Sequence, residues 1–418
     1  MALFLYTSCY KAAFTSNLNS LPVIRLLLIY TLLFTTLVTH TSCDKDAVAA
    51  PVAEKELYVS SELVTTVPKA LLQSLASADG FGIYSDEIKY GVSVYRLQYY
   101  TTYQGREVKA SGLVCVPVGM AAPAPVISAQ HGTIFTQNDA PSSFTGLSGF
   151  ELFAAAGYVT LIPDYIGFGA SGDVFHPYYD QKHSAHAVVD MIKASRRFYT
   201  EKNINVNEQL FLVGYSEGGY VTLAAQKEIE TNPKHNLKVT ASAAGAGGYD
   251  LSSMLAGVTS GQTYPYPAYL AYVLMAYNST NNWNRPLTDF FQEPYASRLP
   301  QLFNGKNGGS AINRELTTDP QKLFNPVFYN NLKDATKELT LKQALLANSF
   351  HDWAPQSPTR LYHGTSDDIV PFTNSKLAYE RFMAKGAPQT ELISINGGTH
   401  STSFIPMLQS LIPWIRSF

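Results

Sequence analysis

Cysteine is scarce in this sequence. The 418 residues include only three, and Cys9 and Cys43 fall in an N-terminal stretch that we expect to be removed or modified. Cys115 sits in the alternating run 113–116, where we expect a small buried hydrophobic residue rather than a catalytic thiol. The folded part therefore has no disulfide framework, and a hydrophobic core must stabilise it, for which the chain is long enough.

An excess of basic residues is also missing. Lys and Arg total 30 against 32 Asp and Glu, and charged residues make up 15% of the chain. Without spare cations to neutralise a phosphate backbone, nucleic acid is not an expected partner. Aromatic residues are abundant instead: 27 Tyr and 22 Phe are typical of pockets whose walls are apolar with polar tips.

The N-terminal stretch has the composition of an export segment. Residues 21–38 are almost wholly apolar or Thr, with Arg25 near their start, and Cys43 follows closely. This arrangement resembles the lipobox of bacterial lipoproteins, although His40 departs from it. We predict an export signal over residues 1–42, lipid attachment at Cys43 and a tether over residues 43–67. The protein would then be exported and held at the cell envelope, periplasmic or at the cell surface; a plain membrane anchor or simple secretion is the alternative.

The rest of the chain, residues 68–418, carries the pattern of a sheet covered by helices. A hairpin is predicted first, from two β-rich runs joined by Gln104-Gly105. Short apolar runs then alternate with helical stretches, which indicates a parallel sheet with right-handed crossovers. The predicted strands are 88–103, 108–118, 126–129, 158–162, 210–213, 237–246, 359–362 and 391–395.

The alternation is interrupted once. Between the sixth and seventh predicted strands, from residue 249 to about residue 358, no strand pattern is found, and this is far longer than an ordinary connection. We therefore predict an inserted cap over about 249–358. Its tyrosines at helical spacing, with Tyr269 and Tyr272 among them, either form the core of the cap or line a pocket.

A serine stands between two glycines where a strand gives way to a helix. Residues 214–218 are Gly-Tyr-Ser-Glu-Gly, after the predicted strand 210–213 and before a helix near 218–229. A G-x-S-x-G turn holds its serine in a strained conformation, and close approach of strand and helix leaves no room for Cβ two positions either side. The pattern predicts Ser216 as a nucleophile; the alternative is a tight structural turn.

An acid and a base follow Ser216 in the chain. A serine hydroxyl needs a base, and the base needs an orienting partner. His400, in a Gly-rich loop, is the last histidine of the sequence. Asp367 and Asp368 follow a predicted strand, at the edge where ligand sites of such sheets lie. Both can ionise, so loop geometry decides between them; we favour Asp367.

Two backbone donors are expected for the oxyanion. One is the N–H of Glu217, at the N-terminus of the helix after the nucleophile. The other is expected from the loop after the predicted strand 126–129, where Gln130-His131-Gly132-Thr133 resembles the H-G oxyanion turn of α/β-hydrolases, with Thr133 as the donor. This resemblance implies that His131 shapes the loop, and that Asp164, in the turn after the predicted strand 158–162, supports the serine turn by hydrogen bonding. Three histidines and an aspartate cluster between residues 176 and 186, but a helix start and a solvated face explain them without a metal.

From about Ile88 to the C-terminus the chain resembles α/β-hydrolases. The segment His363–Pro371 resembles their H-G-x-x-D-x-x-V-P acid loop, in which Asp367 matches the acid. Together with 163–165, 214–216 and the large cap, this is similar to the secretory lipase family. The resemblance implies an α/β-hydrolase fold, a mostly parallel central sheet flanked by helices, and a serine carboxylic ester hydrolase, an esterase or lipase, that needs no cofactor and no metal. Its substrate would be a small-molecule or lipid ester.

Two other functions remain open at this stage. One is a serine peptidase of the same fold, of the aminopeptidase or dipeptidyl peptidase type, in which Glu217 holds a substrate ammonium group. The other is a non-catalytic binding module on the same scaffold. Such a module is expected to lack a member of the triad, and neither Ser216, Asp367 nor His400 is missing.

Overall fold

A computed structural model describes residues 56–78 and 82–418. The predicted export segment and Cys43 lie outside these residues. Within the described part, no helix is both long enough and apolar enough to cross a bilayer.

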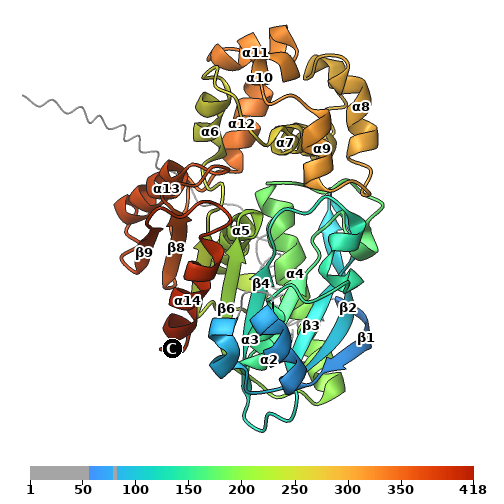
Figure 1. Ribbon diagram of the computed structural model, residues 1–418, viewed down its shortest axis with the longest axis vertical. Helices are drawn as coiled ribbons and strands as arrows, with labels where there is room; N and C mark the ends of the chain where they lie inside the picture. The colour runs from blue at the N-terminus through green and yellow to red at the C-terminus, as the bar shows by residue number, and fades with distance from the viewer. Residues whose placement is uncertain (1–55, 79–81) are drawn as a thin grey trace, which may run out of the picture. The chain divides into compact units, whose positions relative to one another are not determined.

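A nine-stranded mixed sheet forms the centre of the fold (Figure 1). The strands lie in the order β1-β2-β3-β5-β4-β6-β7-β8-β9. The first three pair antiparallel with their neighbours, and all pairs from β5 to β9 are parallel, so the predicted α/β-hydrolase architecture is confirmed. The strands are β1 (Tyr58–Val67), β2 (Val92–Tyr103), β3 (Arg106–Pro117), β4 (Ala124–Gln130), β5 (Val159–Pro163), β6 (Val206–Tyr215), β7 (Ala241–Gly245), β8 (Thr359–Gly364) and β9 (Thr390–Ile395).

The predicted hairpin is present as β2 and β3. Tyr103 pairs with Arg106, so only Gln104 and Gly105 form the turn, and both have positive φ (50° and 74°). Two-residue turns of this kind match the right-handed twist of the strands they join. Gly105 adopts this conformation without steric cost.

Strand β1 corrects the predicted tether over residues 43–67. Residues 58–67 are not a linker, because Tyr58–Val67 pairs antiparallel with β2 at the edge of the sheet. Most of the side chains on this strand are half-buried or exposed, as is typical of an edge strand with only one neighbour. Its Ser, Thr and Glu content hid it from a hydrophobicity-based prediction.

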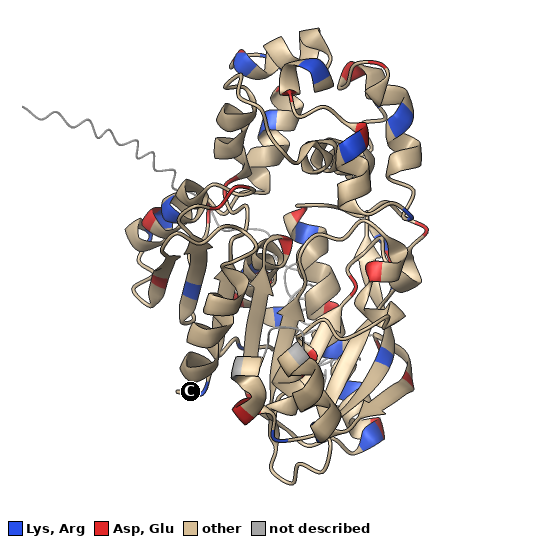
Figure 2. Ribbon diagram, viewed as in Figure 1, with Lys and Arg blue, Asp and Glu red and all other residues tan. Residues whose placement is uncertain are grey.

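Helices cover both faces of the sheet. One face carries α4 (Gln181–Lys202), α5 (Glu217–Thr231) and α13 (Phe372–Ala384); the other carries α2 (Lys69–Ala78), α3 (Glu151–Ala155) and α14 (Phe404–Ile415). Two separate apolar clusters fill the spaces between the sheet and these layers. Lys and Arg are interspersed with Asp and Glu over the described ribbon (Figure 2).

The cap lies between β7 and β8. Because β1 adds a strand that was not predicted, these are the seventh and eighth strands rather than the sixth and seventh. Four phenylalanines with almost no exposed surface, Phe290, Phe291, Phe324 and Phe328, form an aromatic core within the cap. Its helices are α6 (Leu251–Val258), α7 (Pro267–Thr280), α8 (Tyr295–Leu302), α9 (Gly309–Glu315), α10 (Pro320–Leu323), α11 (Pro326–Lys333) and α12 (Leu339–Ala347).

A buried aspartate fixes the start of the cap to the core. Asp250 accepts hydrogen bonds from the hydroxyl of Ser252 (2.6 Å) and the N–H of Ser253 (3.0 Å), and forms an ion pair with Arg381 of α13 (2.7 Å). Burial opposes ionisation of this carboxyl, but the hydrogen bonds and the Arg381 charge outweigh it and lower the pKa of Asp250 to about 2.

We expect Asp250→Asn to lower the free energy of unfolding by about 2 kcal/mol at pH 7. A carboxyl whose pKa is depressed on folding stabilises the protein above its ordinary pKa and loses this effect as pH falls through the folded value. The difference between wild type and variant should therefore be constant above about pH 4 and shrink between pH 4 and pH 2. Urea unfolding across this range measures it. Asp86→Asn is the control: Asp86 is exposed, so this substitution should change the free energy of unfolding by less than about 0.5 kcal/mol. Equal effects of Asp250→Asn and Asp86→Asn would contradict this account.

Candidate active site

Ser216 occupies the sharp turn between β6 and α5. Its φ of 59° is positive, which is strained for a residue with a side chain, and its N–H is held by the carbonyl of Gly245 (2.8 Å). A Cβ at Gly214 would overlap the carbonyl of Gly218, and one at Gly218 would overlap the carbonyl of Gln130. The two flanking glycines are therefore required by the close approach of strand, helix and neighbouring loop.

His400 and Asp367 meet Ser216 from two other loops. The hydroxyl of Ser216 donates to Nε2 of His400 (2.8 Å), and Nδ1 of His400 donates to Oδ2 of Asp367 (2.7 Å). The three predicted residues, separated by up to 184 positions in the sequence, thus form one continuous hydrogen-bonded chain. Such a chain is the geometry that makes a hydroxyl nucleophilic.

The two neighbouring aspartates have different surroundings. Oδ1 of Asp367 accepts the N–H groups of Ile369 (2.9 Å) and Val370 (2.8 Å). Burial raises the pKa of the Asp367 carboxyl, but hydrogen bonds from His363 and His400 outweigh it and hold the pKa well below its ordinary value. Asp368 instead accepts from the hydroxyl of Tyr266 in the cap (2.8 Å). Of the two aspartates, Asp367 therefore bonds to the imidazole of His400, whereas Asp368 faces the backbone N–H of His400 (3.4 Å).

His363 lies behind Asp367 with almost no exposed surface. Its Nε2 faces the carbonyl of Val370 (2.9 Å) and Oδ2 of Asp367 (3.2 Å), and its Nδ1 faces the hydroxyl of Ser375 (2.6 Å). Both neighbours of Nε2 can only accept, so Nε2 carries the proton and Ser375 donates to Nδ1 in the neutral ring. His363 therefore orients the carboxylate that orients His400.

We expect His363→Leu to lower kcat/KM for an ester about 10- to 100-fold, because loss of a residue that orients a catalytic group typically lowers activity by this factor. Without the N–H of His363, the Asp367 carboxylate attracts the proton on His400 more strongly. The fall in activity at low pH should therefore begin at a higher pH in the variant than in the wild type. His363→Gln, which offers an N–H at a similar position, should restore part of both. A His363→Leu variant with reduced stability but an unmoved pH profile would mean that His363 only supports folding.

Glu217 follows the nucleophile directly, and Thr133 follows Gly132, which lies against the nucleophile turn. A Cβ built on Gly132 would stand 3.6 Å from Cβ of Ser216. The Thr133 hydroxyl is hydrogen-bonded to that of Tyr178 (2.9 Å). Glu217 is the first residue of α5, where backbone N–H groups have no partner within the helix.

The side chain of Glu217 points into the fold. Its carboxyl is only 1% exposed and hydrogen-bonds to Nε2 of His176 (2.7 Å). Nδ1 of His176 donates to the carbonyl of Ile166 (2.6 Å), so the histidine links the turn after β5 to the start of α5. Because the Glu217 carboxyl is buried and bonded to His176, it is not free to bind a substrate ammonium group.

The other residues singled out by sequence have structural partners. His131 stacks on Tyr165, with ring centroids 4.1 Å apart. Asp164 is fully buried and accepts from the hydroxyl of Ser111 (2.5 Å) and the N–H of Ser142 (2.7 Å). Cys115 is buried, which raises the pKa of its thiol. Across residues 56–78 and 82–418, no group of three or more His, Cys, Asp or Glu side chains is arranged to hold a metal.

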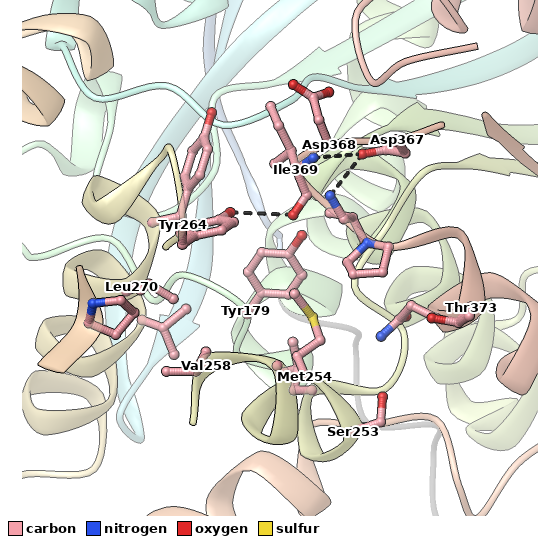
Figure 3. A pocket seen from close by; sticks show the side chains of 18 of the residues that line it. Tyr179, Ser253, Met254, Val258, Tyr264, Leu270, Asp367, Asp368, Ile369 and Thr373 are labelled. Carbon is pink, nitrogen blue, oxygen red and sulfur yellow. Dashed lines mark hydrogen bonds between the residues drawn. The ribbon is translucent and has the colours of Figure 1, made fainter. Parts of the chain in front are cut away.

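A cavity of about 380 Å³, the cap cavity, opens beside Ser216 (Figure 3). It lies between the cap and the acid loop, and the hydroxyl of Tyr264 donates across it to the carbonyl of Ile369 (3.3 Å). Tyr269 lines this cavity, whereas Tyr272 is buried against Tyr178, so the cap tyrosines serve both predicted purposes. The apolar wall is formed by Leu251, Met254, Val258, Leu270 and Val273.

Sequence reasoning missed two supporting pairs. Nothing in the spacing of His176 and Glu217, 41 residues apart, indicates that they touch. His363 was identified only as part of a motif, and its contact with Ser375 depends on how α13 packs against β8.

Comparisons with known proteins agree with this fold. The sequence pattern of the secretory lipase family matches residues 147–417. Lipase 6 of Candida albicans is 26% identical over 326 residues, which cover 75% of this chain and 64% of the relative. The chain therefore spans less than two thirds of the length of that lipase.

Two solved structures are similar over most of the chain. A ligand-bound form of the rice cell wall degrading esterase LipA from Xanthomonas oryzae has a TM-score of 0.77 and 25% identity, covering 87% of this chain and 98% of that one. Candida antarctica lipase A in its closed state shares the fold with a TM-score of 0.64 at 18% identity, covering 87% and 82%. Because the family pattern covers more than half of its residues, the chain belongs to the secretory lipase family.

Proposed function

We propose that this protein is a carboxylic ester hydrolase, an esterase or lipase that works through a covalent acyl-enzyme. The observation that carries the proposal is the hydrogen-bonded chain from Ser216 through His400 to Asp367, with Ser216 in the wall of a cavity. Family membership and the lipase and esterase relatives support the same chemistry.

The reaction follows from the positions of these groups. Ser216 Oγ attacks the ester carbonyl carbon while its proton passes to Nε2 of His400, and the carbonyl oxygen becomes an oxyanion. Backbone N–H groups of Thr133 and Glu217 would stabilise that oxyanion. The bond from carbon to the alcohol oxygen then breaks, and His400 returns the proton to the departing alcohol. Water, activated in turn by His400, releases the acid and restores Ser216.

The peptidase alternative loses the observation that suggested it. It required a free carboxylate beside the nucleophile to hold a substrate ammonium group, and the Glu217 carboxyl is buried and paired with His176. The non-catalytic alternative requires a broken triad, and all three side chains are present and connected.

One activity panel tests the proposal. Nitrophenyl esters of graded acyl length are compared with aminoacyl anilides at equal enzyme concentration. The proposal predicts kcat/KM at least about 100-fold higher for the best ester than for any anilide, since the Glu217 carboxyl that would hold an amine is buried and paired with His176. Faster hydrolysis of an anilide would favour the peptidase, and no hydrolysis of either together with no fluorophosphonate labelling would favour a binding module.

Export and lipid attachment form a further part of the proposal. The family is described as secretory, which suggests export, and the apolar stretch before Cys43 supports a lipid anchor at that residue. Growth of a producing bacterium with an alkyne-labelled fatty acid should label the protein and should not label Cys43→Ala. Labelling of both forms, or of neither, contradicts attachment at Cys43.

A further inference from the structure

A second cavity, of about 500 Å³, adjoins the loop that follows β4. We call it the loop cavity. One wall is the oxyanion loop, residues 131–134, and a second wall is the segment 139–151 that precedes and begins α3. The third wall consists of Tyr215, the residue before the nucleophile, and Phe404 of α14. No residue of α6 or α7 lines it, so it is separate from the cap cavity.

The loop cavity adjoins the nucleophile turn through Gly132 and Tyr215, while Ser216 and Asp367 line the cap cavity. Gly132 lines the loop cavity, and the bare face of Gly132 looks at Ser216, because a Cβ there would make only ordinary contacts with Cβ of Ser216 (3.6 Å) and the carbonyl of Tyr215 (3.5 Å). Gly132 therefore lies against the nucleophile turn and also lines this cavity.

A row of aromatic rings connects the loop cavity to His400. Phe150 meets Phe404 edge to face, Phe404 meets Tyr215 at 5.4 Å, and Tyr215 packs on the His400 ring at 5.4 Å. The hydroxyl of Tyr215 also donates to the carbonyl of His400 (2.6 Å). Asp367, which holds the other side of His400, lines the cap cavity. The imidazole is thus held from both cavities.

Acyl transfer needs two separate spaces. Once the carbonyl oxygen points to its N–H donors, the acyl chain and the alcohol must leave the attacked carbon in different directions, and the alcohol oxygen must come within reach of His400 Nε2. The cap cavity has an aliphatic wall suited to an acyl chain. The loop cavity has aromatic rings and, at its rim, the hydroxyl-bearing residues Thr145 and Ser148.

The loop wall is held in place by a buried acid. The Glu151 carboxyl is 1% exposed and accepts the N–H groups of Ser148 (2.9 Å) and Gly149 (3.0 Å) and the hydroxyl of Ser148 (3.1 Å). These bonds fix the turn that forms one wall, so the cavity exists before a ligand enters, as is typical of ligand sites.

We propose that the loop cavity is the subsite for the alcohol part of the ester, and that it accepts a ring-sized alcohol, aryl or cyclic polyol, rather than a small open-chain one. This inference rests on the proposed ester hydrolase function and names its substrate class. Aromatic walls stack on the faces of rings, and a volume of 500 Å³ exceeds what a one- or two-carbon alcohol can fill.

The test uses esters that share one acyl group. Methyl, benzyl and cyclohexyl butyrate and glucose 6-butyrate all give the same butyryl-enzyme, and their alcohols are all unactivated leaving groups, so differences in kcat/KM report how the alcohol part is held during acylation. The wild type should prefer a ring-bearing alcohol to methanol by about tenfold or more. The benzyl, cyclohexyl and glucose arms distinguish aryl from aliphatic-ring and polyol recognition. Equal kcat/KM for all four esters would overturn the proposal.

Two matched substitutions separate the cavities. Leu147→Trp fills the loop cavity and should lower kcat/KM for the preferred ring ester about tenfold more than for methyl butyrate, with the preference for acyl length unchanged. Val258→Trp fills the cap cavity and should change the preference for acyl length, with the preference among the alcohols unchanged. Thr145→Trp, on the exposed rim, repeats the first test if Leu147→Trp does not fold. The inference is wrong if the loop variants change acyl preference instead of alcohol preference. If the wild type hydrolyses none of these esters, the proposed function itself is wrong.

Discussion

Ser216→Ala is expected to lower kcat for ester hydrolysis by about 10⁶-fold, because it removes the hydroxyl that donates to His400 Nε2 and with it the covalent route. KM should change little, since the cap cavity remains. The fold should persist, because among the described residues the bond of the Ser216 hydroxyl is to the imidazole of His400 and not to a structural partner.

Initial rates with a nitrophenyl ester measure this effect, and Ser253→Ala provides the matched control. Ser253 lines the same cavity, but its hydroxyl donates to the carbonyl of Asp250 rather than to a base. The control should change kcat by less than about threefold. A Ser216→Ala enzyme that retains a tenth of the wild-type rate would show that another group is the nucleophile.

Asp367→Asn is expected to lower kcat by about 10⁴-fold. The amide no longer stabilises the imidazolium that forms when His400 takes the proton of Ser216, and its NH₂ group favours the wrong tautomer of the ring. The fold should persist, since the amide has nearly the same shape and its oxygen can still accept the N–H groups of Ile369 and Val370.

Asp368→Asn is the matched control for this substitution. The two residues are adjacent, yet the Asp368 side chain is exposed and bonds to Tyr266 of the cap. We expect its kcat to fall by less than about tenfold. If Asp368→Asn were the more damaging change, the assignment of the acid would have to be reversed.

The main features of the fold could be predicted from sequence because the relevant signals are local. Apolar runs of about five residues alternate with helical stretches, and this rhythm specifies a parallel sheet covered on both faces. The serine turn was predictable for the same reason, since a strand, two glycines and a helix surround Ser216 within a few residues. His400 was predictable because the chain offers no other histidine after the acid loop.

The features that could not be predicted depend on contacts between distant segments. Strand β1 has the composition of a linker, and it becomes a strand only because β2 offers it an edge. The acid-loop motif favoured Asp367 over Asp368, but the backbone N–H groups that turn the Asp367 carboxylate inward could not be predicted. From the sequence, Glu217 could have been a substrate anchor beside the nucleophile. Its hydrogen bond to His176 instead makes it an internal structural residue.

The most direct test of the central claim is to find which residue a fluorophosphonate modifies. The full-length protein is treated with the probe, digested, and the modified peptide is sequenced by mass spectrometry. We predict one adduct per chain, on Ser216, with labelling lost in Ser216→Ala and strongly slowed in His400→Ala. An adduct on any other residue, or labelling at an undiminished rate without His400, would contradict the proposed catalytic chain.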